Sequence, residues 1–130
     1  GAISDYTRAI EINPKDGDAY YNRAVVKDKL EDYYGAITDY TKALEINPND
    51  KSAYKNRGVN KGILKDYYGA ISDYTKALEI DPNDANLYIN LSIEKESIGD
   101  IKGACADAKK AVSLGDIDSD NQKWINDNCV

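Results

Sequence analysis

The chain of 130 residues contains no histidine, no methionine and only two cysteines. Without histidine, the Ser-His-Asp and Cys-His arrangements of nucleophilic catalysis are excluded, and so are most zinc sites. Because methionine is absent, Gly1 is not an initiator residue, and we expect a fragment or a processed chain. No uncharged run approaches the roughly 18 apolar residues of a membrane span, and no signal-peptide pattern opens the chain. We therefore expect a soluble protein, with the cytoplasm favoured.

Positive charge is also in short supply, since 23 acidic residues outnumber 17 basic ones and give a net charge of −6. Nucleic-acid-binding proteins need basic stripes to neutralise phosphates, and anionic membrane surfaces attract the same charge. We therefore expect no nucleic-acid and no membrane partner. A basic or neutral polypeptide suits this surface better.

What the chain does contain is a repeat of 34 residues. Blocks 17–50 and 51–84 are identical at 24 of 34 positions. Within block 17–50, we expect helices over roughly 18–30 and 34–46. The second helix has its apolar residues on one face, and Pro48 stops it because proline cannot continue the hydrogen-bond ladder. A repeat of this length predicts a solenoid of stacked helical units.

The repeating positions closely resemble the tetratricopeptide repeat family. Residues that carry the resemblance are Tyr20, Ala24, Ala36, Tyr40, Ala43 and Pro48, which recur as Tyr54, Gly58, Ala70, Tyr74, Ala77 and Pro82. Block 85–118 matches more weakly. The resemblance implies an all-α, right-handed superhelix of antiparallel helix pairs forming a single domain over 1–130. Its parts would be 1–16 (the second helix of a truncated repeat), 17–50, 51–84 and 85–118 (three repeats) and 119–130 (a capping helix).

Several positions depart from the family pattern. Arg23 and Arg57 replace leucine, and a guanidinium at a partly buried site needs an acceptor. We expect that acceptor among Asp5, Asp39 and Asp73 on the second helices. Glu31 and Lys65 replace the glycine between the two helices of a repeat. If that turn needs a positive φ, each replacement costs about 1 kcal/mol.

The first segment would also lack the helix that normally covers one side of it. We therefore expect an exposed apolar face at Ile3, Tyr6 and Ile10, covered by further native sequence or by a neighbouring molecule. Such a face makes the N-terminal helix a candidate surface for a homo-oligomer.

The resemblance further implies that the first helix of each repeat lines a concave peptide-binding groove. The groove residues expected here are Tyr21, Asn22, Val25, Lys29, Lys55, Asn56, Val59, Ile63, Asn86, Ile89, Asn90 and Ile93. Among them, an asparagine recurs in all three repeats, and its amide can pair with both the N–H and the C=O of an extended peptide. Val25, Val59 and Ile93 form a parallel apolar strip. The alternative is that these asparagines stabilise packing between repeats and that the apolar residues are buried between layers.

Some family members hold a C-terminal carboxylate in a basic clamp. The corresponding positions in this chain are Tyr21, Val25, Asn56, Asn86 and Asn90, and only Asn56 matches. Binding of an acidic tail is therefore disfavoured. Lys27, Lys61 and Lys95 also recur in register, and we interpret them as a solvated helix edge with weak salt pairs.

The segment Asp116 to Asp127 approaches the spacing of a calcium-binding loop, but Asn121 replaces its glycine and Asp127 its glutamate. We interpret these acids as helix caps and expect no metal and no cofactor. Cys105 and Cys129 would fall at the same level of two antiparallel helices. A disulfide is therefore open to them, which would suit an oxidising compartment, and the alternative is two buried thiols.

Taken together, these features predict a non-catalytic protein–protein interaction module that binds a peptide or protein segment in its groove. One alternative is an auxiliary domain of a larger enzyme. Another is a solenoid that assembles head to tail through its incomplete ends.

Overall fold

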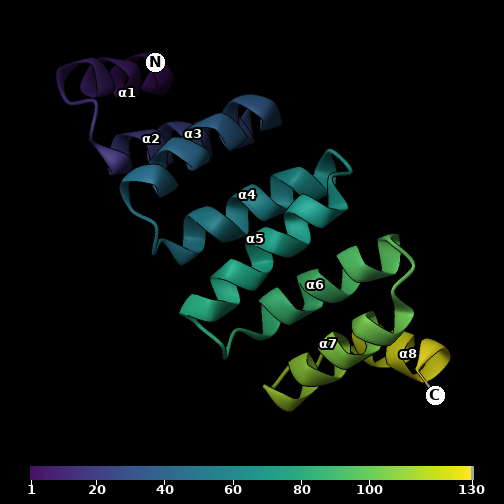
Figure 1. Ribbon diagram of the computed structural model, residues 1–130. Helices are drawn as coiled ribbons and strands as arrows, with labels where there is room; N and C mark the ends of the chain where they lie inside the picture. The colour runs from purple at the N-terminus through teal and green to yellow at the C-terminus, as the bar shows by residue number, and fades with distance from the viewer. Residues whose placement is uncertain (130) are drawn as a thin grey trace.

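The computed structural model describes residues 1–129, which form eight α-helices and no strand. The helices are α1 (Ala2–Ile12), α2 (Gly17–Lys29), α3 (Tyr33–Ile46), α4 (Lys51–Ile63), α5 (Tyr67–Ile80), α6 (Ala85–Ser97), α7 (Ile101–Ser113) and α8 (Ser119–Asn128). Figure 1 shows them stacked in one row from the N-terminus to the C-terminus, and each helix packs mainly on its neighbours in the sequence. The prediction of an all-α helical-repeat solenoid is confirmed. None of the helices within residues 1–129 has the length and apolar character needed to cross a membrane.

An aspartate caps the N-terminus of every helix from α2 to α8. In each case the carboxylate accepts a hydrogen bond from a backbone N–H of the first turn, which has no partner within the helix. These caps are Asp16, Asp32, Asp50, Asp66, Asp84, Asp100 and Asp118. The bonds measure 2.8 to 3.3 Å. Two caps per repeat therefore fix where each helix of a pair begins.

The turns between paired helices require a left-handed backbone. Glu31 has a φ of 61° and Lys65 a φ of 66°, and Gly99 occupies the same place in the next repeat with a φ of 84°. The expectation that these turns need a positive φ is thus confirmed. Between repeats the chain instead leaves the helix in an extended conformation before proline, as at Asn47 with a φ of −128°.

The core lies between the stacked helices and alternates small and large side chains. One cluster joins Ala24, Ala36, Tyr40, Leu44 and Ala53, and a second joins Ala70, Tyr74, Ala77, Leu87 and Leu91. Alanine lets neighbouring helices approach closely, and the tyrosine and leucine side chains fill the remaining space. Each cluster draws residues from successive repeats, so the repeats stabilise one another.

The N-terminal end is less exposed than the sequence suggested. Ile3, Tyr6 and Ile10 are half-buried because α1 packs against α2, so the expected exposed apolar face is exposed only in part. No residue of α1 is fully buried, however. Exposed apolar side chains at this end are Ile12 and Leu30.

Candidate peptide-binding surface

The twelve residues expected to line a groove all lie on α2, α4 and α6, four on each helix. They differ in how much they are used for packing. Tyr21 and Val25 on α2 pack against the first core cluster. In contrast, Val59, Ile63 and Ile93 on α4 and α6 are 38%, 50% and 53% exposed. The apolar strip is therefore closed at its N-terminal end and open over the second and third repeats.

The three asparagines have different surroundings. Asn22 is exposed and Asn90 half-buried. Asn56 is half-buried, and its Nδ2 donates to the Tyr21 hydroxyl of the preceding repeat at 3.2 Å. The interpretation that the recurring asparagines stabilise packing between repeats thus applies to Asn56. Asn22, in contrast, is exposed to solvent. Since one Asn56 N–H is already engaged, its second N–H and its carbonyl oxygen are the groups left for a ligand.

A buried polar cluster connects the first two repeats behind Asn56. The Tyr40 hydroxyl donates to Asp28 Oδ2 at 2.6 Å, and Asn60 Nδ2 donates to Asp28 Oδ1 at 2.5 Å. Burial and the Asp28 carboxylate together raise the pKa of Tyr40 well above its usual range. The phenol therefore remains a hydrogen-bond donor at all working pH values. Because each oxygen of Asp28 accepts one of these bonds, we assign Asp28 to repeat packing.

The next repeat interface has a different chemistry at the same place. Asn60 is replaced by Glu94, and Asp28 is replaced by Gly62. Glu94 is buried, with 9% of its surface exposed, and its carboxylate lies so close to the Gly62 backbone that a Cβ there would collide with it. Burial raises the pKa of this carboxyl. Sequence reasoning missed Glu94, although the break in the repeat at two facing positions was visible in the alignment of the blocks.

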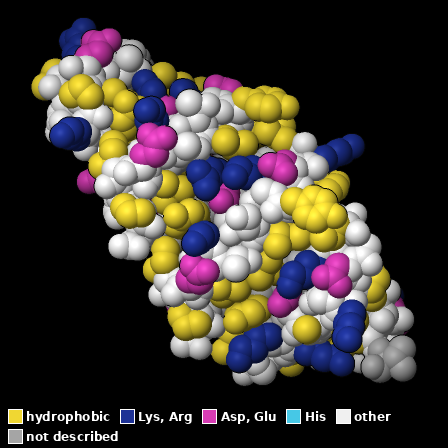
Figure 2. All heavy atoms as spheres, in the orientation of Figure 1, with side chains coloured by type: hydrophobic (Ala, Val, Ile, Leu, Met, Phe, Trp, Pro, Cys, Tyr) yellow, Lys and Arg dark blue, Asp and Glu magenta, His cyan; other side chains and the backbone are white. Residues whose placement is uncertain are grey.

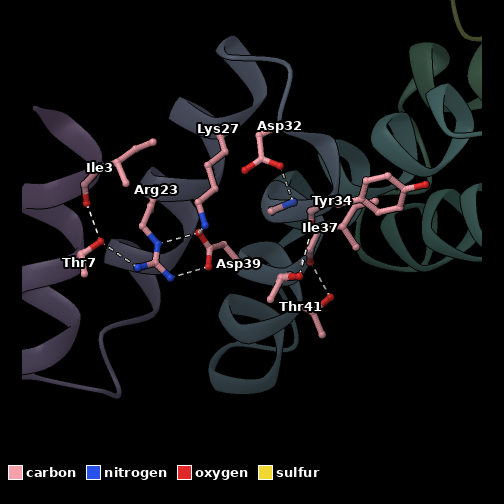
Figure 3. A network of polar contacts seen from close by, with 11 residues as sticks. Ile3, Thr7, Arg23, Lys27, Asp32, Tyr34, Ile37, Asp39 and Thr41 are labelled. Carbon is pink, nitrogen blue, oxygen red and sulfur yellow. Dashed lines mark hydrogen bonds and ion pairs between the residues drawn. The ribbon is translucent and has the colours of Figure 1, made fainter.

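A network of charged groups lies between the helices of the first repeat (Figure 3) and recurs in the second. Arg23 Nε and Nη2 donate to the two oxygens of Asp39 at 2.8 and 2.7 Å, and Lys27 Nζ lies 2.9 Å from Asp39 Oδ2. Arg23 Nη1 also donates to Thr7 Oγ1 on α1, which in turn donates to the Ile3 carbonyl. One arginine therefore joins three consecutive helices.

The second repeat reproduces this network atom by atom. Arg57 donates to both oxygens of Asp73 at 2.8 and 2.7 Å and to Thr41 at 3.1 Å, and Lys61 lies 3.2 Å from Asp73. The predicted acceptors Asp39 and Asp73 are confirmed. Asp5 holds the equivalent place on α1 and forms no ion pair within residues 1–129.

The lysine ladder is consequently more buried than a solvated helix edge. Lys27, Lys61 and Lys95 each pair with an aspartate of the following helix, and the Asp39 and Asp73 side chains are only 2% and 3% exposed. The interpretation as an exposed edge is wrong, because sequence spacing does not show that a lysine stem can lie along the helix and bring its ammonium to a buried acid. Oppositely charged side chains lie beside one another along much of the face drawn in Figure 2.

This network decides the protonation of its central acid. Burial alone would raise the pKa of Asp39, but hydrogen bonds from Arg23 and Lys27 outweigh it, and the pKa is lowered. Hydrogen bonding to the same carboxylate raises the pKa of Arg23. Both groups are therefore charged at neutral pH, and the network is structural.

At the C-terminal end, α8 is attached to α7 by the disulfide between Cys105 and Cys129, whose Cα atoms lie 5.7 Å apart. The nearby acids act as caps. Asp118 Oδ1 accepts from the Asp120 N–H at 2.8 Å, and Asp116 Oδ2 accepts from Asn121 Nδ2 at 2.7 Å. Their carboxylates are thus committed in part to ordering the start of α8.

The sequence profile of the tetratricopeptide repeat matches residues 17–50 and 52–84, together more than half of the chain. The chain belongs to the tetratricopeptide repeat family. A comparison with curated protein sequences found no match.

Solved structures with the same fold include three of particular interest. A crystal structure of MamA has a TM-score of 0.85 and 19% identity over 88% of this chain and 67% of that one. YrrB, described as a TPR protein with an unusual peptide-binding site, has a TM-score of 0.80 and 26% identity over 92% of this chain and 62% of that one. The first TPR of Spaghetti (RPAP3), solved with the HSP90 peptide SRMEEVD, has a TM-score of 0.79 and 18% identity over 85% of this chain and 88% of that one. This chain therefore spans about two thirds of the length of MamA and YrrB.

Tetratricopeptide repeat proteins generally act as protein-interaction modules. Which surface receives the partner depends on the geometry described above.

Proposed function

We propose that this chain binds an extended peptide segment along the surface formed by α2, α4 and α6. The observation that carries the proposal is the open apolar strip on α4 and α6. Val59, Ile63 and Ile93 leave between 38% and 53% of their surface in contact with solvent. Aliphatic side chains that are aligned on adjacent helices and left uncovered gain free energy when a partner removes them from water.

Two asparagine side chains beside the apolar strip are suited to hydrogen bonding with the backbone of an extended peptide. Asn22 and Asn90 stand one turn before the strip positions Val25 and Ile93, and an amide can both donate to and accept from a peptide unit. A ligand that pairs its main chain with these amides and turns alternate side chains toward the strip would use both sets of groups. The likeness to YrrB, a TPR protein with a peptide-binding site, supports this type of ligand.

The chemistry of the same positions disfavours an acidic tail. The clamp that some family members use requires lysine or arginine at three positions, and this chain has Tyr21, Asn86 and Asn90 there. A carboxylate-rich ligand would also meet a net charge of −6. We therefore propose a neutral or basic peptide as the partner.

The test is an array of random peptides probed with the labelled chain. Binding to a subset of peptides is expected, and the double variant Ile63→Asn/Ile93→Asn should lose it. The matched control is Tyr34→Asn/Tyr68→Asn, which changes two exposed side chains on α3 and α5 and should keep it. Equal loss in both double variants, or no capture by the unmodified chain, would overturn the proposal.

A second candidate is self-association at the N-terminal end. A cavity of about 620 Å³ opens between α1 and α2, lined in part by Ile3, Val26 and Leu30. Val26 occupies the position at which Asn60 and Glu94 contact the preceding repeat, so this surface is shaped to receive another helix. Light scattering over a wide concentration range tests the idea. A molar mass that rises with concentration and stays constant in Leu30→Lys would support it, and a constant monomer mass would refute it.

A further inference from the structure

The apolar strip leads into a cavity that the capping helix α8 helps to form. It lies between α6 and the capping helix α8, has a volume of about 270 Å³, and is lined on its apolar side by Ile89, Ile93 and Trp124. This volume falls just short of the roughly 300–1,000 Å³ of sites for drug-sized ligands. One bulky side chain is therefore the natural occupant.

The rim of this cavity, which we name the cap pocket, is acidic. Glu96 from α6, Asp120 from α8 and Asp118, which caps α8, all line it, and no lysine or arginine does. None of these three carboxylates forms an ion pair within residues 1–129. The only basic residue of α8, Lys123, does not line the cap pocket but a second cavity, which it shares with Asp127 and with Asp118.

We propose that the cap pocket holds a bulky apolar side chain of the bound peptide and that its rim selects lysine or arginine next to that side chain. This inference rests on the proposed function, because it specifies which peptide side chains would bind at the end of the surface formed by α2, α4 and α6. Two observations carry it: the apolar floor continues the exposed strip through Ile93, and the three carboxylates that line its mouth form no ion pair within residues 1–129. Apolar burial supplies the affinity, and charge complementarity supplies the preference.

The cap pocket contains its own reporter, since Trp124 is the only tryptophan of the chain. The probe is a synthetic Gly-Ser peptide with a central leucine flanked on each side by two lysines. Titration should shift the Trp124 emission as leucine enters the pocket. A peptide with alanine in place of leucine should bind about tenfold more weakly or worse, because much less apolar surface is buried. A peptide with glutamates in place of lysines should show no saturable shift.

Variants locate the charge effect. Glu96→Gln and Asp120→Asn should each weaken binding of the lysine-flanked peptide about two- to fivefold, as expected for exposed ion pairs, and the loss should diminish at high salt. Asp127→Asn is the matched control, because it removes one charge from the same helix at a residue that does not line the cap pocket. Its affinity should equal that of the unmodified chain.

Two results would overturn the inference. One is equal affinity for the lysine- and glutamate-flanked peptides, and the other is an equal loss in Asp120→Asn and Asp127→Asn. The random-peptide array separates these results from failure of the proposed function. If the array shows capture that depends on Ile63 but no preference for basic residues, the peptide-binding surface stands and the cap pocket is not a selective subsite.

Discussion

Glu31 and Lys65 are the residues whose backbone conformation conflicts most directly with their side chains. A left-handed residue other than glycine costs roughly 1–2 kcal/mol, and glycine recovers this at the expense of greater freedom in the unfolded chain, about 0.5–1 kcal/mol. Glu31→Gly and Lys65→Gly should therefore each raise the free energy of unfolding by about 0.5–1 kcal/mol. Urea unfolding measures the change. Glu31→Ala is the control and should stay near the unmodified value, and a decrease in Glu31→Gly would contradict the account.

Glu94 gives stability a pH dependence of opposite sign to that of most acids. Its pKa is raised above the ordinary value of 4.5 because the carboxyl is buried, so the folded state holds a proton that the unfolded state has already released. Its contribution to stability therefore falls as pH rises from about 4.5 through the folded pKa.

The corresponding prediction concerns Glu94→Gln. This variant should be more stable than the unmodified chain at pH 7, and the difference should shrink as the pH falls toward 4.5. Thermal unfolding across this pH range measures it. Glu96→Gln makes the same change two residues along at an exposed position and should show no such trend. A pH-independent difference for Glu94→Gln would refute the assignment.

At the residue scale, sequence reasoning succeeded where a chemical requirement was visible. A guanidinium in place of leucine demanded an acceptor, and Asp39 and Asp73 provide it. It failed for Lys27, because burial of its partner depends on how α2 and α3 pack. It also missed Glu94, whose environment is set by a glycine on another helix.

Among the elements, the helices lie within a residue of the expected bounds in the first repeat, at Gly17–Lys29 and Tyr33–Ile46. The hydrophobic period and the proline positions were sufficient for this. The sequence analysis expected aspartate caps only before α8, although Asp32, Asp66 and Asp100 recur at the repeat period. Recognising them would have fixed each helix start from the sequence alone.

The capping helix α8 depends on its disulfide more than on its core. Among its residues, only Ile125 is buried, and it packs chiefly on α7. The bond between Cys105 and Cys129 spans 24 residues, for which loop-closure entropy corresponds to about 3 kcal/mol in the chain-entropy description.

Reduction should therefore loosen α8 before the rest of the molecule. Hydrogen exchange under reducing conditions should accelerate in 119–128 while the amides of α2 to α5 stay protected, and Trp124 emission should shift to longer wavelength. The double variant Cys105→Ser/Cys129→Ser should show the same exchange rates as the reduced protein, and adding reductant should not change them. Unchanged protection of α8 would show that packing alone holds it.

For the whole molecule, the repeat period determined the architecture because each repeat contacts only its neighbours. The sequence could not show which groove positions are left open. Val25 and Val59 have the same residue type and repeat position, yet Val25 packs against the first core cluster and Val59 is 38% exposed. Val25 packs on residues of its own repeat and of the following one, and the corresponding cluster of the next repeat does not include Val59.

The most direct test of the peptide-binding account is a chemical-shift map of the isotopically labelled chain, recorded with a peptide selected from the random array. The account predicts perturbations that concentrate on α2, α4 and α6, with the largest at Val59, Ile63, Asn90 and Ile93. Perturbations confined to α3, α5 and α7 would contradict it, because the partner would then occupy the opposite helices of the solenoid.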